Sequence, residues 1–165
     1  GWDVIAVLKR TPVIWALFVA QLLIGLGFGL FSGAVGGTLL DTITQGDQAR
    51  SLVASLTEAQ RSAHFWVTVL LDTAYPLAYG GFFAAMALRF YGKSGRLAAL
   101  PALATIIVDL TENTVQALAL SGAADVLDAK DWLTPLKFGL FFFAAAIALV
   151  ALIIAVVNLF RKRQA

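Results

Sequence analysis

Three carboxylates and an amide lie in two apolar stretches of the chain, where ionisable side chains are rare. Asp72 belongs to the sequence LDTAYPLAYG, and Asp109, Glu112 and Asn113 belong to DLTEN. A charged side chain at the centre of a bilayer costs roughly 2.5–3.5 kcal/mol on insertion scales, so such residues are usually functional. Carboxyl groups can exchange protons with a bound molecule or hold a cation. We therefore take Asp72, Asp109 and Glu112 as candidate catalytic residues.

Further polar residues recur at helical spacing around these acids. At about 100° per residue, each stretch gathers its polar side chains on one face of a helix. Neither face can point towards lipid, so we expect the two faces to meet. The first face carries His64, Thr68, Asp72, Tyr75 and Tyr79; the second carries Thr105, Asp109, Glu112 and Gln116, with Asn113 at its margin.

The two polar faces also match in depth. A rise of about 1.5 Å per residue places Asp72 level with Glu112, and Ser32 of an earlier stretch in the same layer. Pro76 cannot donate to the carbonyl of Asp72, so that carbonyl is an additional acceptor. The candidate ligand-binding residues are His64, Thr68, Tyr75, Tyr79, Asn113, Gln116 and Ser32.

The acids have few bases to balance them, and they cannot all be ionised in a dry interior. Either some are protonated, or a cation is bound, or a basic side chain reaches in. We expect Lys137 to extend to the outer membrane surface rather than into the bundle. Asp72, Asp109 and Glu112 could supply oxygen ligands, but their spacing is diagnostic of no metal. We predict no metal site, and the sequence does not show whether a cofactor is bound.

Composition assigns the elements that carry these residues to a membrane. The chain has 165 residues, of which 60% are hydrophobic and 13% charged, whereas soluble domains have about 25% charged residues. We predict an all-α integral membrane protein, a single transmembrane domain with four spans. A short amphipathic helix is expected in the first outer loop, between residues 41 and 63. The predicted spans are residues 12–40, 64–89, 97–120 and 134–160.

The distribution of lysine and arginine predicts the orientation. Eight basic residues flank one side of the four spans and four flank the other. Basic residues are enriched in short cytoplasmic segments, so both termini are expected in the cytoplasm. We expect the bacterial inner membrane as the location. The basic residues form no stripe, so nucleic-acid binding is not expected.

Glycines recur every fourth residue in the first span, at Gly25, Gly29, Gly33 and Gly37. Small residues at this spacing allow a second helix to approach closely. The pattern predicts a glycine zipper that packs against another helix of the bundle or against a membrane-protein partner.

The layout of the chain resembles that of the four-helix sterol isomerase and sigma-2 receptor group. The shared features are cytoplasmic termini, a long first loop, a tight second turn and acids within the bundle. The helix-borne His/Glu pair expected of the isomerases is not recognisable here. The resemblance therefore implies a topology and does not extend to the isomerase activity.

Three functions are compatible with the sequence. The first is a site for a small or lipidic ligand, with acid/base chemistry by the carboxylates. The second is a non-catalytic accessory or assembly subunit of a membrane complex, in which the polar faces only hold helices together. The third is a proton or cation pathway along the same carboxylates.

Overall fold

The computed structural model describes residues 3–164, and within them the chain is 86% helical and contains no strand. Three helical segments are long and apolar enough to cross a membrane: 11–31, 92–121 and 127–164. The prediction of an all-helical chain is thus confirmed, and the three segments are consistent with integration in a membrane. α4 (Glu58–Phe90), which carries one of the two polar faces, is not among these three segments.

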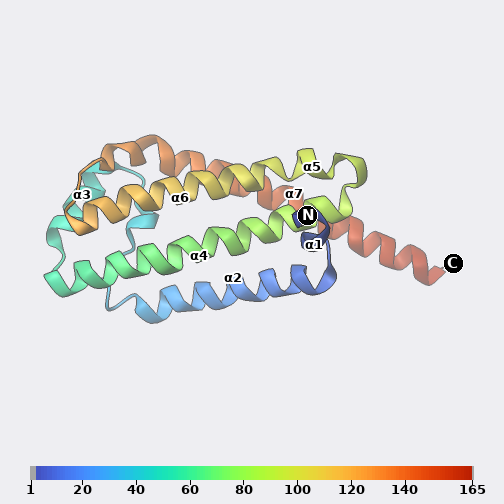
Figure 1. Ribbon diagram of the computed structural model, residues 1–165, viewed down its shortest axis with the longest axis horizontal. Helices are drawn as coiled ribbons and strands as arrows, with labels where there is room; N and C mark the ends of the chain where they lie inside the picture. The colour runs from blue at the N-terminus through green and yellow to red at the C-terminus, as the bar shows by residue number, and fades with distance from the viewer. Residues whose placement is uncertain (1–2, 165) are drawn as a thin grey trace.

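Four long helices lie side by side (Figure 1). α4 is central and packs against the other three, α2, α6 and α7. Short helices occupy the two ends of the bundle, with α3 at one end and α1 and α5 at the other (Figure 1). The elements are α1 (Val4–Leu8), α2 (Thr11–Phe31), η1 (Leu40–Thr42), α3 (Gly46–Ser55), α4 (Glu58–Phe90), η2 (Gly92–Ser94), α5 (Gly95–Ala98), α6 (Leu100–Ser121), η3 (Leu127–Ala129) and α7 (Lys130–Gln164).

α4 begins well before the predicted span because a capping box defines its start. Thr57 accepts a hydrogen bond from the backbone of Gln60, and the Gln60 side chain accepts one from the backbone of Thr57. This arrangement satisfies two backbone donors that a helix start leaves free. The helix continues for 33 residues with Pro76 in its interior, a length of about 50 Å.

α2 ends at Phe31 and does not continue to residue 40 as predicted. Gly36 and Gly37 follow in the left-handed backbone region, with φ of +100° and +89°. Glycine adopts this region without strain, so the chain turns here and leaves the helix axis. Gly33 and Gly37 therefore do not extend a helical face from Gly25 and Gly29.

The glycines also lack the packing expected of a zipper within this chain. A methyl group added at Gly25, Gly29, Gly33 or Gly37 would meet no neighbouring segment of residues 3–164 within 4 Å. The expected packing of this face against another helix of the same bundle is therefore not observed.

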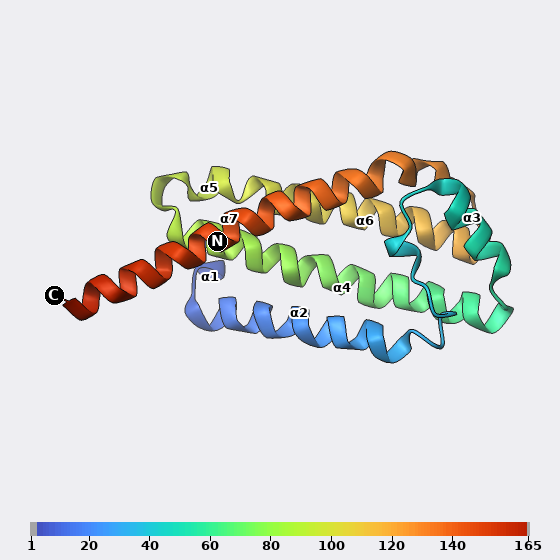
Figure 2. The ribbon, with the colours of Figure 1, turned by 180° about the vertical axis from the view of Figure 1, so that it is seen from behind.

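α7 begins at Lys130, before the predicted start at residue 134, so Pro135 lies inside the helix and Thr134 is not its N-cap. Its far end extends beyond the other helices (Figure 2). Two apolar cores stabilise the bundle, one beneath α3 around Leu56 and Leu127, the other near α1 around Ile14 and Met86. The polar faces of α4 and α6 lie between these cores.

Candidate functional site

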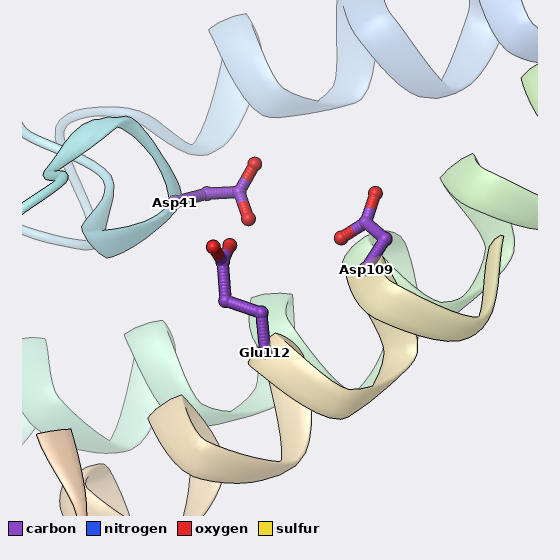
Figure 3. A group of neighbouring side chains, drawn as sticks. All are labelled: Asp41, Asp109 and Glu112. Carbon is purple, nitrogen blue, oxygen red and sulfur yellow. The ribbon is translucent and has the colours of Figure 1, made fainter. Parts of the chain in front are cut away.

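Three carboxylates converge from two distant parts of the chain (Figure 3). Asp41 lies on η1, which covers the bundle at its α3 end, and Asp109 and Glu112 lie one turn apart on α6. One oxygen atom from each side chain lies within 4.8 Å of the other two. We call Asp41, Asp109 and Glu112 the acidic cluster.

Lys137 of α7 is buried in this cluster. Its Nζ lies 2.8 Å from Glu112 Oε1 and 3.0 Å from Asp41 Oδ1. The side chain is only 5% exposed, so the expectation that it extends to the outer surface is wrong. The buried carboxylates offer the ammonium better electrostatic compensation than the half-polar membrane interface would.

Two further residues of α7 contact Glu112, and one of them also binds Gln116. Thr134 donates a hydrogen bond to Glu112 Oε2 at 2.5 Å, and Lys130 Nζ lies 3.7 Å from that atom. Lys130 also donates to Gln116 Oε1 at 2.8 Å and is fully buried. Lys130, Thr134 and Lys137 are four and three residues apart, which places them on one helix face. That spacing was the signal in the sequence that these residues act together.

Asp109 forms a separate pair with α4. The hydroxyl of Tyr79 donates to Asp109 Oδ2 at 2.5 Å, and both side chains are buried. Since Asp72 is expected level with Glu112, Tyr75 rather than Tyr79 is expected level with Asp109, and the long Tyr79 side chain spans the additional helical turn. Tyr75 instead packs edge-on against the rings of Phe28 and Tyr79.

The backbone of Asp72 is bound by Asn113. The carbonyl that Pro76 leaves without a helical donor accepts a hydrogen bond from Asn113 Nδ2 at 2.5 Å. The carboxyl group of Asp72 is buried and close enough to the acidic cluster to interact with its charges. One turn away, Thr68 Oγ1 is buried with no hydrogen-bond partner among residues 3–164. The expected facing of Asp72 and Glu112 is not observed as a contact, because Glu112 is bound by α7.

Three other predicted residues have local roles. The backbone of Leu40 donates to His64 Nε2 at 3.1 Å, and His64 Nδ1 lies 3.2 Å from the carbonyl of Val35. His64 thus joins α4 to the loop that carries Asp41. Ser32 donates to the carbonyl of Gly29 at the end of α2, and Thr105 donates to the carbonyl of Pro101 within α6. None of these three contacts reaches the acidic cluster.

Asp41 is the member of the cluster that lies outside the membrane-spanning helices. Burial alone would raise the pKa of Asp41, but the neighbouring Lys137 ammonium holds that pKa below its ordinary value. Asp41 is therefore ionised at neutral pH, and together with Glu112 it fixes the position of the Lys137 ammonium. A metal ion bound by the cluster would have to displace this ammonium.

The site is closed at the end remote from η1 by aromatic rings. Tyr79 packs against Phe83 and Phe141 with ring centroids 6.0 and 5.1 Å apart, and Phe83 packs against Phe141 at 5.4 Å. These rings belong to α4 and α7 and lie directly below the Tyr79–Asp109 pair. These rings separate the polar groups from the apolar core near α1.

Comparison of the chain with protein-family models, with curated proteins and with solved structures finds no match in any of the three. The resemblance in layout noted from the sequence thus receives no support from similarity of sequence or structure. Function has to be argued from the site itself.

Proposed function

We propose that this chain is a four-span membrane protein whose buried polar site between α4 and α6 binds a small or lipidic ligand and performs acid/base chemistry on it. One observation carries the proposal: ionisable side chains from α4, α6, α7 and η1 gather at one buried position. Four acids, Asp41, Asp72, Asp109 and Glu112, meet two lysines there. Burying so many charges is costly, and it is usually retained where it serves binding or catalysis.

The roles follow from the contacts of each side chain. Glu112 is held between Lys137 and Thr134 and acts as the charge that anchors the site. Asp109 and Tyr79 share a short hydrogen bond and form the pair best placed to exchange a proton with a ligand. Asp72, whose carboxyl group is not engaged by α7, is the second acid or base. The ligand enters from the α3 end by displacing η1, which breaks the Lys137–Asp41 contact.

The aromatic rings below Tyr79 favour a binding site over a transmembrane pathway. A proton or cation pathway needs polar groups or water across the whole bundle. Phe83 and Phe141 occupy the next layer, and the core around Met86 follows. Conduction along the carboxylates would therefore end at Tyr79.

The proposed topology has four spans, with both termini in the cytoplasm of a bacterial inner membrane. α4 is long enough to cross a membrane and packs against α2, α6 and α7. These three helices belong to segments that are long and apolar enough to cross a membrane, so the polar face of α4 need not meet lipid. Three of the four basic residues on the opposite, outer side form ion pairs: Lys130 and Lys137 are buried with Glu112, and Arg50 contacts Asp47, Asp125 and Asp128. This supports the asymmetry from which the orientation was derived.

Amide substitutions test the acid/base proposal. Asp72→Asn, Asp109→Asn and Glu112→Gln keep the shape of each side chain but cannot exchange a proton as a carboxylic acid does. Four carboxyl groups face two ammonium groups, so we expect at least one protonated carboxyl band in the infrared spectrum of the wild type, lost in one of the three variants.

The same variants, purified in parallel with the wild type, report on ligand binding. Mass spectrometry should detect a small molecule or lipid that the wild type retains and that Asp109→Asn loses while it remains folded. Identical retained molecules in the wild type and all three variants, with no protonated carboxyl band, would show that the polar site only holds the helices together.

A second function, an accessory subunit that docks through α2, is favoured by the open glycine face. Gly25, Gly29 and Gly33 meet no neighbouring segment of the described chain, and α2 lies at the edge of the bundle (Figure 1). Substituting Gly29→Leu would block close approach of a partner helix. Loss of a copurifying membrane protein in this variant, with the retained small molecule unchanged, would favour the accessory function.

A further inference from the structure

A second binding site lies at the end of the bundle opposite the acidic cluster, and it does not depend on the proposed function. A hollow of about 330 Å³ opens between α2, α4 and α7 near the start of α2. Its walls are almost entirely apolar. They include Trp15 and Phe18 from α2, Phe82 and Met86 from α4, and Leu152 from α7.

A basic hollow adjoins this apolar one. It measures about 420 Å³, shares Phe90 and Ala155 with the first, and is bounded by Arg161 and Lys162 near the end of α7. The shared residues place the two hollows next to each other. The combined site is apolar over most of its length and positively charged at one end.

Arg89 adds a positive charge at the rim of the apolar hollow. Its Nη1 atom donates to the carbonyl of Lys9 and to the hydroxyl of Thr11, and its guanidinium lies 5.5 Å from the ring centre of Phe90. These contacts hold the guanidinium at the level where α2 begins. Helix starts and ends of membrane spans lie at the depth of the lipid headgroups.

We propose that this site binds an anionic phospholipid, with an acyl chain in the apolar hollow and the phosphate between Arg89, Arg161 and Lys162. Charge complementarity selects this occupant. A neutral lipid or an apolar helix would fill the hollow but leave three positive charges without a counterion. Basic residues near a membrane surface favour anionic lipid by about fivefold each.

Tryptophan fluorescence provides a local probe, because Trp15 lines the hollow and its side chain is 62% exposed. A variant carrying Trp2→Phe, Trp66→Phe and Trp132→Phe retains Trp15 alone. It would be reconstituted into phosphatidylcholine vesicles containing brominated acyl chains on either phosphatidylglycerol or phosphatidylcholine at equal mole fraction. Bromine quenches tryptophan on contact, so the ratio of the two quenching curves gives the lipid preference at Trp15.

We expect brominated phosphatidylglycerol to quench Trp15 at a several-fold lower mole fraction than brominated phosphatidylcholine. Arg161→Gln with Lys162→Gln should remove most of that preference, because two of the three basic side chains at the site lose their charge. Both side chains are exposed, near the end of α7, so the substitution leaves the bundle core intact.

A control tryptophan separates this site from a general surface effect. Leu26→Trp, in a background in which Trp15 is also replaced by Phe, lies on α2 away from the hollow, and the leucine is 66% exposed. It should be quenched equally by both lipids. Equal quenching of Trp15 by both lipids, the same preference at residue 26, or a preference that survives the double substitution would each overturn the proposal. Ala155→Leu, which narrows the hollow without changing charge, should weaken the quenching of Trp15 by phosphatidylglycerol.

Discussion

Replacing Lys137 tests whether its ammonium is the positive charge that makes the acidic cluster tolerable. Lys137→Met removes the charge while keeping an unbranched side chain of similar length. Glu112, which is fully buried, then loses the partner 2.8 Å away. Removing one partner of a buried ion pair costs about 3–5 kcal/mol, which for a chain of this size lowers the Tm by about 6–20 °C.

A second substitution should repair part of this loss. Glu112→Gln removes the uncompensated charge in the Lys137→Met background and keeps an oxygen that accepts from Thr134. Asp41 tolerates the loss of Lys137 better, because its side chain is 26% exposed. The double variant should therefore be about 2 kcal/mol more stable than the sum of the two single effects indicates.

Thermal or denaturant unfolding of the four proteins in one detergent or bilayer measures this coupling. Lys93→Met is the matched control, because Lys93 is exposed in the turn between α4 and α5; its effect should stay within about 0.5 kcal/mol. The reasoning would be refuted if Lys137→Met behaved like Lys93→Met, or if the two substitutions at the cluster were strictly additive.

Two further predictions concern backbone positions. Asn113→Ala should lower the free energy of unfolding by about 1–3 kcal/mol, because it leaves the buried Asp72 carbonyl without a donor. The loss should be smaller in a Pro76→Ala background, where the helix supplies that donor. Equal losses in the two backgrounds, measured by unfolding, would contradict the assignment. Gly37→Ala should lower the free energy of unfolding by about 1–2 kcal/mol because of the left-handed backbone at this position, whereas Gly33→Ala should be nearly neutral. Unfolding of both variants measures the difference, and equal stability would exclude the conformational explanation.

The residues that define the site on α4 and α6 could be predicted because each helix carries its own periodicity. The position of Asp72 and Asp109 in apolar sequence, and their alignment with Tyr79 and Gln116, depend only on the geometry of one helix. The effect of Pro76 on the Asp72 carbonyl is likewise local. The sequence also predicted a helical chain with spans long enough for a membrane, because composition alone determines that.

The packing between segments could not be predicted in the same way. Counting depth from the loops placed Asp72 level with Glu112, and the contact of Asn113 with the Asp72 carbonyl agrees with that register. The side-chain pairing could not be counted in this way, because the long side chain of Tyr79 reaches along α6 to Asp109. The end of α2 was also misplaced, because a glycine-rich apolar sequence is compatible with both a helix and a turn. Only the backbone φ angles distinguish the two.

By itself, the sequence determined which acids lie in long apolar helical stretches and which faces of two helices they share. Only the tertiary structure decided how their charges are balanced. Asp41 enters from a loop that His64 holds against α4, and Lys137 enters from α7, 25 residues after Glu112 in the chain. Whether a lysine at a helix start extends to the surface or into the bundle depends on the rotation of that helix against its neighbours. That rotation is fixed by packing with distant residues, and no local pattern records it.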